Sequence, residues 1–356
     1  MEMSCDGPWS TAGTHPRDHG GPDAYGVAPH DFSTNANACG PCPAVLEAVQ
    51  SADPRHYPDP AYTRLREHLG AFHDVPAARI LLAGSASEFI HRITAFVAMR
   101  GLHARKGAAP ALSLPAHSYG DYLHAAKAWH LHVVRRGADG RRPGGAALLH
   151  WACEPASPTG AADPALELWQ RQDEGDTGLQ IVDCAYVPLR LDGQLVCMPE
   201  RAWQLWTPNK ALGLTGVRAA YAIAPANAAP GCVDALQGLA PSWPVGAHGV
   251  ALLHAWVQPQ TQQWLQDSLV TLRGWKAAQL GLCESLGWQI LPGSLTNYFT
   301  AQLPIHDVPG ALKVLRARGI KLRDCASFDL PGHVRLGVLA PASQHALAQA
   351  WRAARG

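Results

Sequence analysis

The 356-residue sequence has almost no net charge, no long apolar run and no paired framework of cysteines. Lys and Arg total 29 against 28 for Asp and Glu, so the net charge of +1 supplies no field to gather nucleic acid or anionic lipid. No stretch approaches the roughly 20 apolar residues that cross a bilayer, and the first residues lack a basic segment leading into an apolar one. These absences predict a cytoplasmic protein without a nucleic-acid or membrane partner.

The nine cysteines form an odd count scattered over a long chain, which fits reduced thiols better than a secreted disulfide scaffold. Cys39 and Cys42 form a close pair, but they follow a polar run rather than a predicted strand, and no second pair completes a zinc site. We therefore expect no bound metal, and the sequence assigns this pair no role.

Short apolar runs alternate with helical patterns, which is typical of an α/β fold with a mainly parallel sheet. The predicted strands of this sheet cover residues 79–83, 109–114, 146–151 and 179–182. Helices are predicted from Ser87 and Gly120, and two more within 44–69, separated by a Pro-rich break at Tyr57 to Pro60. A long helix at 250–286 leads to further strands at 288–290, 298–303 and 333–338. The expected parts are an arm with some of a small domain (1–43), a large domain (44–249), and a linking helix with the remaining small domain (250–356).

The segment from Thr207 to Arg218, TPNKALGLTGVR, combines a lysine, glycines that allow close backbone approach, and an arginine eight residues after the lysine. A lysine amine forms an imine with an aldehyde and then serves as a base, while a guanidinium binds phosphate bidentately. For this segment alone, an exposed lysine in a Gly-rich turn is the alternative. The segment resembles the lysine motif of class I/II aminotransferases. This resemblance implies an aspartate-aminotransferase-like fold, pyridoxal 5'-phosphate (PLP) as cofactor, Lys210 as its attachment point and Arg218 at its phosphate.

A second motif, Asp183 to Tyr186 (DCAY), closes a predicted strand and is similar to the D-x-x-Y of the same family. The resemblance implies that Asp183 pairs with the pyridinium nitrogen and keeps the ring an electron sink, while Tyr186 donates its phenol to the cofactor's O3'. A solvated carboxylate at a strand end is the alternative for Asp183.

A third motif, SASE, stands between a predicted strand and a helix, where free N–H groups and the helix dipole favour phosphate. It resembles the family's phosphate loop and implies that Ser85, Ala86 and Ser87 bind the cofactor, with Thr207 adding a hydroxyl. A helix N-cap would explain Ser87 equally well.

Two tyrosines match family positions around the cofactor. Tyr119, with His117 as the alternative, stands where relatives place an aromatic ring that stacks on the cofactor. Tyr57 matches a tyrosine that reaches the phosphate in the other subunit's site, so the resemblance implies a homodimer.

The C-terminal part carries residues expected at the substrate. HVRLG resembles the strand whose arginine, here Arg335, binds the substrate's α-carboxylate, and Asn297 matches a nearby family asparagine. Ser157 is a departure, because relatives usually place an asparagine there that hydrogen-bonds O3'. We expect Ser157 to face the cofactor with altered tuning, or with water filling the gap.

The cofactor motifs do not name the reaction, because the protein decides which bond at Cα breaks. Further segments, HGG from His19, DFSTNANACGP and RDCASF, resemble L-threonine-O-3-phosphate decarboxylase, a relative of histidinol-phosphate aminotransferase. That resemblance implies a small amino-acid substrate, which could be phosphorylated, with Asn37 at the substrate and Arg323 at its phosphate. Leu339 stands where those relatives often have another arginine. The sequence therefore favours the decarboxylase and keeps two alternatives, a histidinol-phosphate type aminotransferase and a PLP-binding paralogue with altered activity.

Overall fold

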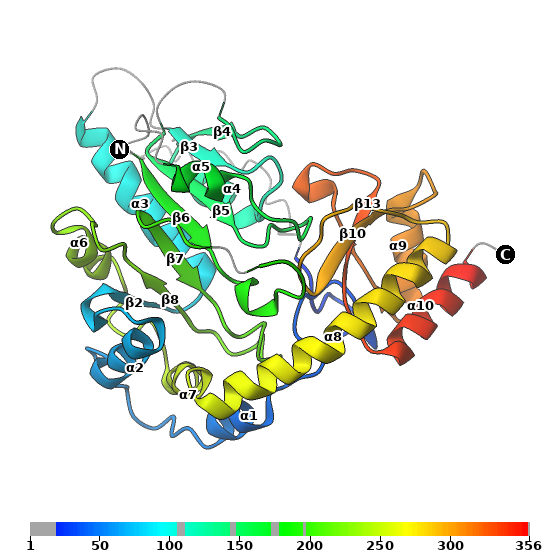
Figure 1. The fold of residues 1–356 in the computed structure, drawn as a ribbon, viewed down its shortest axis with the longest axis horizontal. Coiled ribbons are helices and arrows are strands. Elements are labelled where there is room, and N and C mark those ends of the chain that lie inside the picture. The colour runs from blue at the N-terminus through cyan, green and yellow to red at the C-terminus, as the bar shows by residue number, and fades with distance from the viewer. Residues whose placement is uncertain (1–18, 105–110, 143–146, 172–177, 195–196, 355–356) are drawn as a thin grey trace, which may run out of the picture.

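The computed structural model describes residues 19–104, 111–142, 147–171, 178–194 and 197–354 (Figure 1). Its largest sheet has seven strands in the order β2-β8-β7-β6-β5-β3-β4, in which β8 alone runs against its neighbours. In chain order these strands are β2 (Ile80–Ala83), β3 (Ala111–Leu114), β4 (His132–Arg135), β5 (Leu149–Cys153), β6 (Leu179–Asp183), β7 (Ala202–Trp206) and β8 (Ala220–Ile223). The expected α/β fold with a mainly parallel sheet is confirmed.

The register of the parallel strands brings several motifs to one edge of the sheet. Cys153 at the end of β5 pairs with Asp183 at the end of β6, which pairs in turn with Leu205 near the end of β7. The segments that leave these strands therefore start side by side, as expected for the ligand-binding edge of a parallel sheet.

Helices cover both faces of the large sheet. On one face, α3 (Ala86–Ala104) and α4 (Gly120–Ala128) bury apolar side chains against the strands. On the other face, α1 (Pro43–Gln50), α2 (Thr63–His73) and α7 (Ala247–Trp256) do the same. Two short helices, α5 (Ala165–Gln170) and α6 (Cys232–Gly238), complete this region. The sheet is a scaffold held from two sides, and its strand ends stay available for a site.

The C-terminal region is built on a separate antiparallel sheet with the order β12-β13-β10-β9. Its elements are β9 (Gln289–Ile290), β10 (Tyr298–Gln302), α9 (Val308–Ala317), β11 (Ile320–Lys321), β12 (Arg323–Asp324), β13 (His333–Gly337) and α10 (Pro341–Ala353). The N-terminal strand β1 (His30–Asp31) joins this region by pairing in parallel with β11. The proposed three-part division of the chain stays a prediction, and its first 18 residues lie outside the described part.

The predicted single helix at 250–286 is wrong in one respect. The structure has α7 and then α8 (Pro259–Ser285), which runs from the large sheet to the C-terminal region (Figure 1). Gln258 between them has extended backbone angles, φ −75° and ψ 140°. Proline lacks the N–H that would continue a helix and disfavours helical geometry in the residue before it, so Pro259 begins a new helix. Within the described part of the chain, no helix combines the length and apolar character of a membrane span.

Candidate active site

The turn after β7 presents Lys210. Leu212 N–H donates to the Pro208 carbonyl at 3.0 Å, and Gly213 has a left-handed φ of +69°. A Cβ on Gly213 would lie 3.0 Å from the Gly40 Cα, so a side chain at this position would displace the neighbouring segment. The arm also binds the turn, because Asn37 N–H donates to the Lys210 carbonyl at 2.9 Å. The lysine therefore stands on a turn that the arm contacts at two points, Asn37 and Gly40.

Lys210 lies beside the DCAY motif. Its Nζ is 5.2 Å from the centroid of the Tyr186 ring, and its positive charge acts on Asp183. Lys210 as a whole is half-buried. The structure thus brings the three predicted catalytic residues together.

Asp183 is a buried carboxyl group at the end of β6. Its Oδ1 accepts from Ala185 N–H at 3.0 Å and its Oδ2 accepts from the Tyr122 hydroxyl at 2.7 Å. Burial raises the pKa of Asp183, while the Tyr122 hydrogen bond and the charge of Lys210 act in the opposite direction. The alternative of a solvated carboxylate is wrong, because Asp183 is only 4% exposed.

Tyr186 has a partner that the motifs did not indicate. Its hydroxyl oxygen accepts from the Asn35 side-chain amide at 3.3 Å, which leaves the phenolic proton for another acceptor. The Oδ1 of Asn35 is buried and makes no hydrogen bond within the described residues. Asn35 lies in the DFSTNANACGP segment, and its amide type was the available signal for a site role.

The SASE motif starts α3, but its serines have different tasks. Ser85 Oγ accepts from Glu88 N–H at 3.1 Å, and the Glu88 carboxylate accepts from Gly84 N–H at 3.2 Å. The Ser85 side chain therefore caps α3, so the N-cap is Ser85 and the N-cap alternative for Ser87 is wrong. Ala86 is the first helical residue, and Ser87 Oγ lies 3.3 Å from the Tyr119 hydroxyl.

Two further groups expected at the phosphate lie on either side of the lysine turn. Thr207 is buried, and its Oγ1 has no hydrogen-bond partner in the described structure. Arg218 is exposed and lines a hollow of about 400 Å³ together with His248 and Gly216. Both groups keep hydrogen-bonding capacity for a ligand.

Tyr119 and His117 differ in their contacts. Tyr119 is half-buried and its hydroxyl donates to Asp121 Oδ2 at 2.9 Å, while its ring lies edge-on to Tyr122. His117 Nδ1 is instead 2.8 Å from the Phe328 carbonyl oxygen of the C-terminal region. His117 therefore links two regions of the chain, and a stacking role stays a prediction for Tyr119.

Arg335 on β13 is a buried guanidinium that points to the turn after β5. Its Nη1 donates to Ser157 Oγ at 2.9 Å and its Nη2 donates to the Ser33 carbonyl at 3.1 Å. Its Nε is buried and has no hydrogen-bond partner within the described residues. Ser157 thus contacts Arg335, the arginine expected at the substrate. The family position of Ser157 indicated a contact with the cofactor and did not indicate this one.

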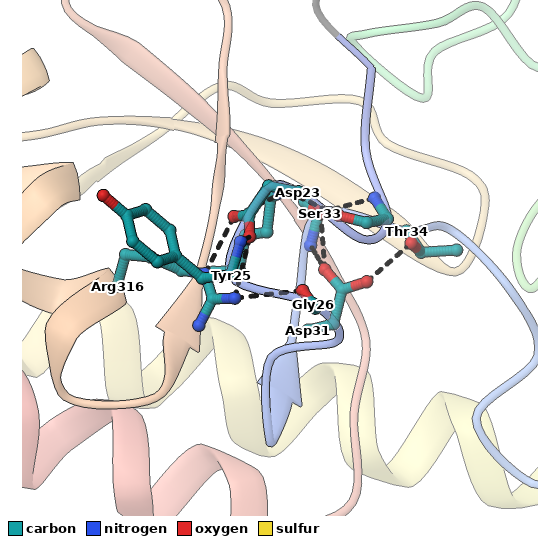
Figure 2. A network of polar contacts seen from close by, with 9 residues as sticks. Asp23, Tyr25, Gly26, Asp31, Ser33, Thr34 and Arg316 are labelled. Carbon is teal, nitrogen blue, oxygen red and sulfur yellow. Dashed lines mark hydrogen bonds and ion pairs between the residues drawn. The ribbon is translucent and has the colours of Figure 1, made fainter.

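Ser33, whose carbonyl accepts from Arg335, is held in place within the N-terminal arm. Figure 2 shows its contacts with Asp31. Ser33 N–H and Oγ–H both donate to Asp31 Oδ1, at 2.9 and 2.5 Å. Further along the arm, Arg316 of α9 makes a two-point ion pair with Asp23 and lowers the pKa of that carboxyl. The arm is thereby tied to α9 through Asp23 and to β13 through the Ser33 carbonyl.

Arg323 shares a face with Arg335, because the two residues are direct partners in the antiparallel pair β12 and β13. Both guanidiniums lie over the Phe328 ring, at 4.8 Å for Arg323 and 5.6 Å for Arg335. Arg323 also donates to Ser327 Oγ at 2.7 Å. The pair places two cationic groups next to each other in a buried setting.

The two predicted substrate asparagines are engaged by the protein. Asn37 Nδ2 donates to Ala211 O and to Ser268 Oγ, and its Oδ1 accepts from Cys39 N–H. Asn297 Nδ2 donates to the backbone carbonyls of the segment that carries Asn35. Asn37 holds the arm against the lysine turn, and Asn297 holds it against the start of β10, so a substrate role for either amide stays a prediction.

Tyr57 lies apart from this cluster, whereas Cys39 and Cys42, to which the sequence assigned no role, lie on the arm beside the lysine turn. Tyr57 is 78% exposed and stacks on Trp243 with ring centroids 4.3 Å apart. Cys39 is half-buried and Cys42 is buried, and both are free thiols. Among the described residues, the contacts of Tyr57 therefore give no support for a role in the site of its own chain.

The cluster suits PLP by its chemistry. It offers an amine for the aldehyde, a buried carboxylate for the ring nitrogen and a phenol for O3'. The unpartnered atoms Thr207 Oγ1, Asn35 Oδ1 and Arg335 Nε are buried polar groups that a polar ligand would satisfy. Sequence motifs missed Asn35, Ser33 and Tyr122, because each acts through a neighbour distant in the chain.

A model of the family described as aminotransferase class I and II matches residues 150–353, which is more than half of the chain. The curated relative histidinol-phosphate aminotransferase 1 of Bradyrhizobium diazoefficiens is 28% identical over 324 residues, covering 86% of this chain and 87% of that protein. The structure of histidinol-phosphate aminotransferase from Sinorhizobium meliloti in complex with PLP has a TM-score of 0.71 at 20% identity, covering 90% and 89% of the two chains. The structure of L-threonine-O-3-phosphate decarboxylase from Porphyromonas gingivalis has a TM-score of 0.71 at 19% identity, covering 90% and 96%. At these identities the two solved structures share the fold with this chain.

Proposed function

The chain belongs to the aminotransferase class I and II family and is a PLP-dependent enzyme, and on that premise we propose that it is an aminotransferase of the histidinol-phosphate type. The observation that carries the proposal is the buried pair Arg335 and Arg323 in register on one face of the C-terminal sheet. Such a pair suits a substrate with an anionic group, and phosphate is well matched by guanidinium geometry. The names of the sequence relatives support the same substrate class.

The decarboxylase favoured by the sequence motifs is the second candidate. The decarboxylase of known structure shares the fold at 19% identity, whereas the relatives that match along most of the sequence are named aminotransferases. Two adjacent arginines also fit an amino acid that carries both a carboxylate and a phosphate. The choice between the two reactions depends on which bond at Cα is broken.

Each site residue has a role in this proposal. PLP supplies an electron sink that makes bonds at the substrate Cα labile. The Lys210 amine would hold the cofactor and would serve as the base for the proton at Cα, while Asp183 would pair with the ring nitrogen. Tyr186 donates its hydroxyl to O3', and Arg335 orients the substrate through its anionic group.

Phosphate binding is assigned to the residues around the start of α3. We assign the cofactor phosphate to the backbone and hydroxyls of Ser85, Ala86 and Ser87, to Thr207 and to Arg218. A helix N-terminus stabilises an anion, and Arg218 adds a full positive charge. Tyr119 is proposed to cover the ring, and Tyr57 to reach the same phosphate in a partner subunit of a homodimer.

The deciding experiment is a half-reaction comparison on the purified PLP-loaded protein. Histidinol phosphate, with a keto-acid acceptor, should convert the cofactor to its amine form and back, without release of carbon dioxide. L-threonine-O-3-phosphate that yields carbon dioxide without a keto acid would instead establish the decarboxylase. Neither turnover, with PLP bound, would point to the altered paralogue.

Lys210→Ala tests the cofactor attachment directly. We expect this variant to lose the visible absorbance of the PLP-loaded protein while keeping its fold, because the half-buried lysine supplies chemistry rather than core volume. Lys127→Ala, which changes an exposed lysine on α4, is the matched control and should keep the absorbance. Unchanged absorbance in Lys210→Ala would remove the central assignment.

A further inference from the structure

Tyr122 is a site neighbour to which the motifs give no role. It lies on α4 with no exposed surface, and its hydroxyl is 2.7 Å from Asp183 Oδ2. Its ring stacks on the ring of Trp151, with centroids 4.5 Å apart and planes 11° from parallel. The stacking fixes the ring, so the position of the hydroxyl is set by packing from β5 as well as by α4.

The direction of this hydrogen bond is determined by its surroundings. Burial and the charge of Asp183 raise the pKa of Tyr122 well above its usual value, so the phenol keeps its proton and donates it. The other oxygen of Asp183 accepts from Ala185 N–H. Within the described residues, Asp183 therefore has one donor on each oxygen, and the side-chain donor is Tyr122.

We propose that Tyr122 is a positioning residue that holds Asp183 as an ionised carboxylate in one orientation, ready to pair with the ring nitrogen of PLP. The proposal rests on the role of Asp183 in the proposed function. A donor to a buried carboxylate stabilises its charged form, and an ionised partner keeps the pyridinium protonated. Tyr122 thus tunes the electron sink without touching the substrate.

The other titratable groups around Asp183 leave this role to Tyr122. The charge of Asp183 acts on the Tyr119 phenol and on the thiols of Cys153 and Cys184, and burial raises the pKa of all three. These groups are therefore neutral at working pH. Lys210 is the charged neighbour, and its amine is engaged by the cofactor in the proposed function.

The test is the pH titration of the visible absorbance of the PLP-loaded protein. In Tyr122→Phe the ring stacking stays and the donor is lost, so a proton shared by Asp183 and the ring nitrogen moves toward Asp183. The PLP ring would then withdraw less electron density from its bond to Lys210. We expect the apparent pKa of the absorbance to rise by about 0.5–1 unit, and PLP to bind more weakly. Tyr221→Phe removes another fully buried phenol, bonded to His73 and Trp256, and should leave the titration unchanged.

A double variant separates positioning from packing. Asp183→Asn cannot ionise, so adding Tyr122→Phe to it should cause no further shift in the titration. An equal shift in both backgrounds, or a Tyr122→Phe titration identical to wild type, would overturn the proposal. If Tyr122→Phe alone fails to fold, folding of the double variant supports coupling through Asp183, and failure of both assigns Tyr122 to packing. Absence of visible absorbance in the wild-type protein would instead remove the proposed function itself.

Discussion

At the scale of single residues, the buried carboxyl of Asp183 is expected to lower the stability of the cofactor-free protein while it strengthens the binding of PLP. Burial raises the pKa of its carboxyl in the folded chain above the usual value of 3.8. Between these two pKa values the folded state binds more protons than the unfolded state, so stability falls as the pH rises. Above the folded pKa the buried carboxyl is ionised, and the full free-energy cost of burying its charge lowers the stability of the folded chain.

Asp183→Asn should therefore stabilise the cofactor-free protein at neutral pH. The gain is about 1.4 kcal/mol for each unit by which the folded pKa is raised, and it should vanish as the pH falls toward 3.8. Urea unfolding of the cofactor-free variant and wild type at pH 7 and pH 4.5 measures this difference. A gain that is equal at both pH values would mean that charge burial is not its cause. The same variant should bind PLP more weakly, because asparagine does not pair with a protonated ring nitrogen as an anion does.

The sequence indicated the residues proposed to touch the cofactor better than those that hold them. Lys210, Asp183 and Tyr186 lie together because their motifs follow adjacent strands whose carboxyl ends meet. Asn35 and Tyr122 approach Tyr186 and Asp183 from segments 151 and 61 residues away. Local patterns carry no information about such pairings, which arise from the packing of the arm and α4.

At the scale of elements, the Ser85 N-cap of α3 gives a matched pair of variants. Ser85→Ala removes the acceptor for Glu88 N–H and should lower the free energy of unfolding of the cofactor-free protein by about 1 kcal/mol. Ser87→Ala leaves the cap intact and should change it by about 0.5 kcal/mol or less. Urea unfolding of both variants checks this, and a larger loss for Ser87→Ala would contradict the assignment of the cap.

Element prediction followed the strength of local signals. The predicted strand at 179–182 is β6 to within a residue, because an apolar run there closes on Asp183. By contrast, neither β7, which reads AWQLW, nor β8, which reads AYAI, was predicted. The break at Pro259 was hidden by apolar periodicity that continues from α7 into α8. Long-range pairing decides such short strands.

At the scale of the whole molecule, the arm joins the substrate side of the site to the rest of the chain. Ser33 O binds Arg335, the neighbouring Asn35 binds Tyr186, and Asn37 N–H binds Lys210 O. These three contacts come from five consecutive residues, so one segment positions Lys210, the proposed cofactor lysine, relative to Arg335, the proposed substrate arginine. Displacement of the arm would therefore disturb both halves of the site at once.

The proposed role of Tyr57 at the partner subunit's phosphate site predicts that the working unit is a homodimer. Tyr57 is 78% exposed, and neither its side chain nor that of Arg218 makes a hydrogen bond or ion pair in the described chain. Light scattering should give twice the 38.0 kDa of one chain. A monomer that binds PLP and turns over with full activity would contradict the shared site.

Complementation tests which subunit supplies Tyr57. Tyr57→Ala and Lys210→Ala should each be inactive or strongly impaired alone, the first through weaker phosphate binding and the second through loss of the amine. When the two are unfolded together and refolded, half of the dimers are mixed. In a mixed dimer the Lys210→Ala subunit contributes its Tyr57 to the site of the Tyr57→Ala subunit, which keeps its own lysine. About one site in four is then complete, and activity should return to that level. If each tyrosine served its own subunit, no complete site would form in any mixed dimer, and activity would stay at the level of the separate variants.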